Sequence, residues 1–297
     1  MPKTAPDIYE VGLRDGFQNL EETVPTPLKV EIAHKLLESG IKRLQLGSFV
    51  SPKAVPQMAD TKELAAHVVN RYPGVRFSAL VPNLFGARAA WESGIREINY
   101  VVSVSLSHNK ANINRTHEQS FEELDKIIAE LPDMQVQFGA STSFACPFEG
   151  ETSLDQLLRI VEKAAERKVN IIELADTIGM AYPTQVEQYL TTVMREFPDI
   201  KFGVHFHDTR NNGVLNSWIA AQIGVDFIQT TVGGLGGCPF APGASGNTAT
   251  EDLVWLLEKS GYNTGVDFNQ LLSCAKLIKE RMNGNYSGHH INIEHCN

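Results

Sequence analysis

Short apolar runs alternate along this chain with longer segments in which apolar residues recur at helical spacing. The short runs are typical of buried strands, and the longer segments are typical of amphipathic helices. Eight strand-like runs occur, at residues 8–12, 43–47, 76–80, 97–104, 135–141, 171–176, 202–207 and 226–231. Helical spacing is clearest in the segments 27–40, 120–131 and 153–168. The alternation therefore predicts eight strand–helix repeats.

Several helical segments end in Gly followed by Ile or Val, as in SGIKR, SGIRE and IGVDF. This pattern is typical of a glycine that caps a helix and leads into the next strand. Eight repeats predict an α/β protein with a TIM (β/α)8 barrel, and a doubly wound open sheet is the alternative. Since no linker divides the chain, we expect one domain over 1–297, in which 266–297 form a C-terminal helix and polar tail.

In a (β/α)8 barrel the active site lies at the carboxyl ends of the strands. This rule selects the polar residues that close each strand-like run as candidate site residues. They are Arg14, Asp15, Gln45, Ser48, Asn83, Ser103, Ser105, Ser107, Ser141, Ser143, Asp176, His205, His207 and Asp208. Charged and imidazole groups are thus expected to converge on one rim of the barrel.

The stretch VHFHD places two histidines, His205 and His207, one residue apart. Alternate residues of a strand share a face, so the two imidazoles are expected side by side. Such a pair can bind a metal ion, or it can be two ordinary hydrogen-bonded histidines. The convergence of Asp15 on the same rim favours the metal site. A carboxylate and two neutral imidazoles suit a divalent ion that keeps open coordination positions.

Two further segments carry candidate chemistry. Arg14 precedes Asp15 in the glycine-flanked stretch GLRDG, and its permanent charge can hold a carbonyl or carboxylate oxygen. The stretch GGLGGCPFAPGASGNTATED, residues 233–252, is rich in glycine and contains Cys238 and Asn247. Cys238 could serve as acid, base or nucleophile, and Asn247 could complete the ligand set.

Composition narrows the class of protein. The net charge of −9 is spread without a basic block, which argues against a nucleic-acid partner, and no apolar stretch is long enough to cross a membrane. The beginning of the chain lacks the apolar core of a signal peptide, and the four cysteines are too scattered for a disulfide scaffold. We therefore expect a cytoplasmic location, with a trimmed organelle targeting segment as the open alternative.

The motifs VGLRDGFQN, SFVSPKAVPQM, NKANIN, CPFEG, ADTIG, VHFHDT and GGLGGCPFAPGASGNTATEDLV occur here in one order. In that order they resemble the 3-hydroxy-3-methylglutaryl-CoA (HMG-CoA) lyase family, from about residue 7 to 275. Related barrel enzymes that condense acetyl-CoA with 2-oxo acids lack the GGLGGCP loop. The resemblance implies a metal-dependent lyase that splits an HMG-type thioester into acetyl-CoA and a keto acid such as acetoacetate.

The resemblance also implies roles for individual residues. The family's metal ligands fall on Asp15, His205, His207 and Asn247, and its catalytic arginine and cysteine fall on Arg14 and Cys238. It implies Mg²⁺ or Mn²⁺ as the cofactor, which lowers the pKa of the substrate's hydroxyl group. His205 or Asp15 would accept that proton, Arg14 would hold the developing enolate oxygen, and Cys238 would protonate the carbanion.

Two substrate-side positions depart from the family pattern. Gln45 stands where the family has Glu, and Gln137 stands where it commonly has Arg. A Glu and an Arg at these strand ends could pair with each other and orient a substrate carboxylate. With Ser141 and Asp176, these glutamines are the expected substrate-binding residues. The departures leave the metal centre intact but put the acyl group in doubt.

Three functions remain to be separated at this stage. The first is a lyase acting on HMG-CoA or a close 3-hydroxyacyl-CoA. The second is an acyl-CoA-condensing synthase, although residues after 265 are too few for a regulatory domain. The third is a non-catalytic barrel that serves as a binding protein. For the enzyme we expect an acyl-CoA substrate and a homo-oligomer, either a dimer or a tetramer.

Overall fold

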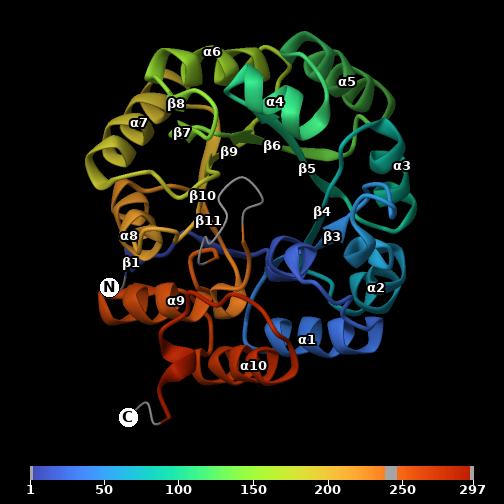
Figure 1. Ribbon diagram of the computed structural model, residues 1–297, viewed down its shortest axis with the longest axis vertical. Helices are drawn as coiled ribbons and strands as arrows, with labels where there is room; N and C mark the ends of the chain where they lie inside the picture. The colour runs from blue at the N-terminus through green and yellow to red at the C-terminus, as the bar shows by residue number, and fades with distance from the viewer. Residues whose placement is uncertain (1–2, 238–245, 295–297) are drawn as a thin grey trace.

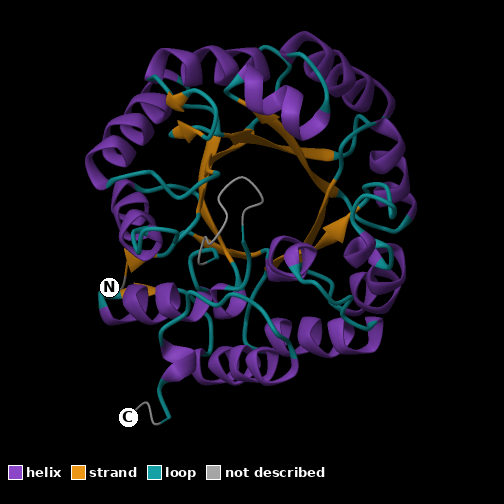
Figure 2. Ribbon diagram, in the orientation of Figure 1, coloured by secondary structure: helices purple, strands orange, loops and turns teal. Residues whose placement is uncertain are grey.

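Eight parallel strands close into a barrel in the computed structural model, which describes residues 3–237 and 246–294. Around the barrel the strands follow the order β10-β11-β2-β3-β4-β5-β6-β9. They are β2 (Asp7–Glu10), β3 (Arg43–Ser48), β4 (Arg76–Leu80), β5 (Glu97–Ser103), β6 (Gln135–Ser141), β9 (Ile171–Asp176), β10 (Lys201–Phe206) and β11 (Phe227–Thr230). Figure 2 shows these strands as a ring inside a circle of helices. The predicted (β/α)8 barrel is confirmed.

Helices cover the outside of the ring (Figure 1). They are α1 (Thr26–Glu38), α2 (Thr61–Val68), α3 (Leu84–Glu92), α4 (Leu106–Ile113), α5 (His117–Glu130), α6 (Leu154–Ala165), α7 (Pro183–Glu196), α8 (Gly213–Ile223), α9 (Thr250–Lys259) and α10 (Phe268–Arg281). The predicted cap glycines Gly40, Gly94 and Gly224 all have positive φ, which glycine adopts without steric strain. None of the described helices is long and apolar enough to span a bilayer.

Successive residues along each strand face two different buried regions, namely the layer between strands and helices and the inside of the barrel. In β10, Phe202, Val204 and Phe206 belong to the apolar core that the strands share with the helices. His205 lies between them in sequence and therefore faces the inside of the barrel. Both faces of a barrel strand are covered, one by the surrounding helices and the other by the side chains that fill the barrel. The polar strand residues are therefore buried as well, as in β3.

The C-terminal extension is more closely joined to the barrel than the sequence suggested. Helix α10 packs against α1 and α9, as expected for an appended helix. The polar residues that follow were expected to lie beyond the barrel, but they fold back onto the glycine-rich loop after β11. Tyr286 bridges to Leu235, and the amide of Gly288 donates to the carbonyl of Gly233 at 3.1 Å. These residues can do so because glycine and short polar side chains let the two loops approach closely.

Candidate metal centre and active site

A single π-helical turn, η1 (Gly12–Gly16), follows β2 and carries both Arg14 and Asp15. The buried carboxylate of Glu10 fixes this turn, since its Oε1 accepts from the amides of Gly12 at 2.7 Å and Val232 at 3.1 Å. A Cβ atom on Gly12 would lie 2.6 Å from that oxygen, so only glycine fits there. Glu10 thereby joins the turn to the loop after β11.

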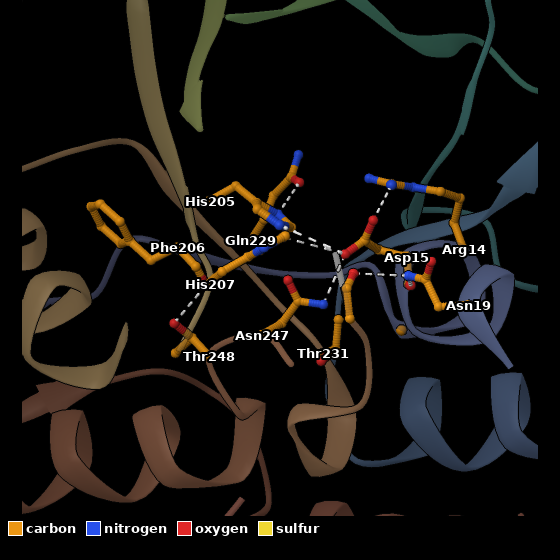
Figure 3. A network of polar contacts seen from close by, with 12 residues as sticks. Arg14, Asp15, Asn19, His205, Phe206, His207, Gln229, Thr231, Asn247 and Thr248 are labelled. Carbon is orange, nitrogen blue, oxygen red and sulfur yellow. Dashed lines mark hydrogen bonds and ion pairs between the residues drawn. The ribbon is translucent and has the colours of Figure 1, made fainter. Parts of the chain in front are cut away.

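Asp15 is the meeting point of the candidate ligands (Figure 3). Its Oδ2 lies 3.7 Å from Nε2 of His205 and 3.9 Å from Nε2 of His207. Asn247, just before α9, donates to the same oxygen through Nδ2 at 2.8 Å. Potential ligand atoms of Asp15, His205 and His207 all lie within 4.8 Å of one another. The structure thus brings together the three groups that the strand-end rule selected for a metal.

The local electrostatics suit a divalent cation. Burial raises the pKa of Asp15, but the charges of Arg14 and the two histidines outweigh this effect and bring that pKa down to about 2. Burial, with a contribution from His205, lowers the pKa of His207 to about 4. Near neutral pH the carboxylate is therefore ionised and the His207 imidazole is neutral, the forms that bind metal.

One buried polar atom at this cluster supports the fit. Oδ1 of Asn247 has no hydrogen-bond partner among the described residues. A buried polar atom without a partner is unfavourable, and a bound ion is one of the explanations for it. An amide oxygen, a carboxylate and two imidazoles form an O/N donor set, so the residues present fit a divalent metal.

Arg14 is held in place beside this cluster. Its Nε donates to Oε1 of Gln45 at 2.5 Å, and its Nη1 pairs with Oδ1 of Asp15. Gln45 is itself anchored, since its Nε2 donates to the hydroxyl of Tyr9 at 3.1 Å. Nη2 of Arg14 makes no hydrogen bond to another described residue, which leaves it available to an oxygen of a substrate.

The other expected substrate residues are arranged differently. Gln137 does not contact Gln45; it accepts from Arg43 at 2.6 Å and donates to Glu173 at 2.7 Å. Asp176 closes β9 and accepts from two backbone amides of its own loop, both at 2.9 Å. Ser141 ends β6 and is partly exposed. Gln45 and Gln137 do not hydrogen-bond to each other, because the two side chains belong to different hydrogen-bond networks.

The structure describes two of the four cysteines. Cys146 and Cys274 are buried, free thiols. Cys146 donates to the hydroxyl of Ser105 at 3.0 Å, and burial raises the pKa of Cys274. Cys238 and Cys296 lie outside the described residues.

Several residues around the site were not selected from the sequence. Gln18 donates to Oδ1 of Asp15 at 2.9 Å, and Asn19 links the carbonyls of Asp15 and Gly237, each at 3.0 Å. Gln229 accepts from Nδ1 of His205 at 3.0 Å. Gln229 was detectable in principle, because a polar residue within an apolar barrel strand must face the interior to avoid the helices.

Residues 5–278 match the model of a protein family described as HMGL-like. The chain belongs to the HMGL-like family. It is 39% identical over 277 residues to a hydroxymethylglutaryl-CoA lyase of Bacillus subtilis, which covers 93% of this chain and 92% of that protein. It is also 39% identical over 278 residues to the human mitochondrial hydroxymethylglutaryl-CoA lyase, covering 93% of this chain and 85% of that protein.

Solved structures of the HMGL-like family show the same fold. The crystal structure of the Bacillus subtilis HMG-CoA lyase matches with a TM-score of 0.93 at 37% identity, over 98% of each chain. An HMG-CoA lyase from Acinetobacter baumannii, in complex with coenzyme A and 3-methylmalate, matches with a TM-score of 0.90 at 35% identity. That match covers 99% of this chain and 98% of the other.

Proposed function

We propose that this protein is a metal-dependent carbon–carbon lyase that cleaves HMG-CoA, or a closely related 3-hydroxyacyl-CoA, to acetyl-CoA and a keto acid. The observation that carries the proposal is the buried cluster of Asp15, His205 and His207 beside Arg14. Such a cluster at the carboxyl ends of barrel strands is where a (β/α)8 enzyme places its catalytic groups. Membership of the HMGL-like family and the names of its relatives support the reaction class.

The proposed metal ligands are Asp15, His205, His207 and Asn247, and Mg²⁺ or Mn²⁺ is the proposed ion. These hard or borderline cations favour carboxylate and amide oxygens together with imidazole. When bound, such an ion supplies Lewis acidity that makes a substrate hydroxyl more acidic. The ligand atoms of Asp15, His205 and His207 lie within 4.8 Å of one another, close enough for one ion to contact all three.

The chain's own residues supply the remaining steps. With Nε and Nη1 engaged, Arg14 can direct Nη2 at the thioester oxygen, on which negative charge develops as the carbon–carbon bond breaks. Of the two proton acceptors expected, Asp15 is a weak base because its pKa is about 2. His205 is the other proposed acceptor of the hydroxyl proton, and it can accept only through Nε2 while that atom is not bound to the ion, because Nδ1 donates to Gln229.

Protonation of the departing carbanion is the proposed role of Cys238. Support comes from Asn19, whose side-chain amide joins the Asp15 turn to Gly237, the residue immediately before Cys238 in sequence. An acid delivered by a loop can also help to exclude water from the reacting atoms. Gln45 is retained as a proposed substrate-side residue because it contacts Arg14, and Ser141 and Asp176 are retained as rim residues.

A cavity of about 420 Å³ beside the site is the proposed location of the CoA moiety. It is lined by Asn19, Gly237 and Arg281, among others, so it opens next to the Asp15 turn. The complex of the Acinetobacter relative with coenzyme A supports an acyl-CoA substrate. We also propose a homo-oligomer and a cytoplasmic location, which light scattering and cell fractionation would test.

The test is an assay of the purified full-length protein with a series of 3-hydroxyacyl-CoA thioesters that includes HMG-CoA. We expect acetyl-CoA and the matching keto acid to appear by liquid chromatography when Mg²⁺ or Mn²⁺ is present. Chelation should stop the reaction, and re-addition of the ion should restore it. If the folded, metal-supplemented protein cleaves none of these thioesters, the proposed function is wrong.

A further inference from the structure

A chain of hydrogen bonds runs through the barrel interior behind the metal cluster. It starts at Arg43, passes through Gln137 to Glu173, and continues through Gln229 to His205. These residues come from β3, β6, β9, β11 and β10, and each is at most 5% exposed. None of them except His205 belongs to the cluster that faces the proposed ion.

The ends of this chain fix the direction of the first bonds. Arg43 can only donate, so the oxygen of Gln137 must face it and the amide nitrogen must face Glu173. Arg43 is itself held in place, since its Nε and Nη2 donate to Glu97 at 3.0 and 2.5 Å and its guanidinium lies over the rings of Tyr9 and Phe227, 4.1 and 4.3 Å from their centroids. The orientation of Gln137 is thereby determined.

Glu173 fixes the remaining bonds. Its Oε2 accepts from the side-chain amides of Gln137, Asn99 and Gln229, with the Asn99 bond at 3.2 Å. Burial raises the pKa of Glu173, but an oxygen that accepts from three amides carries no proton in either protonation state, so Gln229 must turn its nitrogen to Oε2 of Glu173 and its oxygen to His205. That oxygen requires a proton on Nδ1 of His205, at 3.0 Å.

This arrangement decides which nitrogen of His205 can bind a metal. In a neutral imidazole one nitrogen carries the proton and the other carries the lone pair. With the proton held at Nδ1, the lone pair is on Nε2, which is the atom 3.7 Å from Asp15. A histidine ligand usually donates its other ring N–H to a fixed acceptor in this way.

We propose that Glu173 is a positioning residue that acts through Gln229 to hold His205 in the tautomer with a free Nε2, and so sets the affinity of the site for its divalent cation. The inference rests on the proposed metal site of the lyase. It also gives Gln137 a role distinct from substrate binding, because Gln137 carries the constraint from Arg43 to Glu173. Glu173→Gln removes the constraint, since an amide can donate as well as accept and leaves Gln229 free to turn over.

Glu97→Gln is the matched control. Glu97 is also a buried barrel carboxylate, 6% exposed against 4% for Glu173. It pairs with Arg43, at the end of the hydrogen-bond chain that is farthest from His205. The same chemical change is thus made in the same interior without touching Gln229. The two variants and the wild type are compared as full-length proteins, after circular dichroism has shown that each is folded.

The first measurement is the tautomer of His205 in the metal-free protein, from long-range ¹H–¹⁵N NMR correlations. The wild type and Glu97→Gln should show the proton on Nδ1, and Glu173→Gln should show a substantial population with the proton on Nε2. The second measurement is calorimetric titration with Mn²⁺ alone. We expect Kd to rise about 10- to 100-fold in Glu173→Gln, the range for loss of an outer-shell partner.

Glu97→Gln should bind Mn²⁺ within about twofold of the wild type, because Glu173 still accepts from Gln137, Asn99 and Gln229 and so still fixes Gln229. An unchanged tautomer and an unchanged Kd in folded Glu173→Gln would overturn the inference. If that variant does not fold, Gln229→Met breaks the same link and is judged by the same two results. If the wild type binds no Mn²⁺, the metal-dependent function fails, while the tautomer measurement still decides the role of Glu173.

Discussion

Gln137→Arg adds a second guanidinium next to Arg43 inside the barrel, and we expect it to destabilise the fold. The family resemblance alone would favour this substitution, because Arg is common at the position. Here Gln137 is fully buried, and Arg43 already donates to it at 2.6 Å. Arg43 is also paired with Glu97 and lies over the rings of Tyr9 and Phe227, and these contacts hold it in place.

The expected magnitude follows from the surroundings of Gln137. Attraction between the new cation and Glu173 is roughly offset by repulsion from Arg43, since both lie within hydrogen-bond distance of Gln137. What remains is the larger side chain, which costs about 1–3 kcal/mol in a packed interior. The desolvation of an additional buried ion costs several kcal/mol more, even after the surroundings relax. We therefore expect the free energy of unfolding to fall by at least about 3 kcal/mol.

Equilibrium unfolding in urea measures this change, since urea, unlike guanidinium chloride, does not screen charges. Arg43→Gln combined with Gln137→Arg moves the cation instead of adding one, and should be more stable than Gln137→Arg alone. Gln45→Glu serves as a second control. Because Gln45 and Gln137 have separate partners, a double-mutant cycle between them should give a coupling below about 0.5 kcal/mol.

If the free energy of unfolding of Gln137→Arg equals that of the wild type, the barrel interior accepts a second cation beside Arg43. That result would refute the reasoning. A large coupling between positions 45 and 137 would restore the view that the two side chains act as a pair. In that event the double variant, Gln45→Glu with Gln137→Arg, should also cleave HMG-CoA faster than either single variant. The structure instead leads us to expect any gain in kcat/KM from Gln45→Glu alone.

Four further predictions concern the site and its surroundings. His207→Ala should weaken metal binding by more than about 10-fold, and full occupancy by elemental analysis would remove His207 from the ligand set. Cys238→Ala should slow cleavage by about 10² to 10⁴ at unchanged metal content, and near-wild-type turnover would move the protonation step elsewhere. Ser287 donates to the carbonyl of Asn247 at 2.5 Å, so Ser287→Ala should lower Mn²⁺ affinity in calorimetry; an unchanged Kd would show that the C-terminal residues do not support this ligand. Burial, reinforced by Asp252, raises the pKa of Glu251 from 4.5 to about 8, so its contribution to stability is lost as pH rises from about 5 to 8. Glu251→Gln should therefore flatten the pH dependence of unfolding over this range, and parallel curves for the two proteins would contradict the assignment.

The barrel could be predicted from the sequence because each repeat carries its own local signals. Apolar runs mark strands that are buried on both faces, and the glycines at 40, 94 and 224 mark helix ends that require positive φ. These signals are local, so they can be recognised in the sequence without knowledge of the tertiary structure. The helix α4 and the return of the C-terminal residues to the loop after β11 depend on packing between distant segments, and no local pattern indicated them.

The candidate metal cluster was predictable for a related reason. A residue at the carboxyl end of a barrel strand lies on the same rim whichever strand carries it, so Asp15, His205 and His207 could be grouped without knowing any distance. The glycine-rich loop was recognisable from composition, and Asn247 was found within it.

Contacts between side chains inside the barrel are harder to predict from the sequence. Gln45 and Gln137 are both the third residue of a strand, yet they do not hydrogen-bond to each other. Strands of a closed barrel are tilted and staggered, so equal positions along two strands need not lie in the same layer. Gln45 reaches the Arg14 turn, whereas Gln137 joins Arg43 to Glu173. Of the two departures from the family pattern, only Gln45 touches a proposed catalytic group. A difference in acyl-group selectivity should therefore be sought at Gln45, and a difference in metal affinity at Gln137.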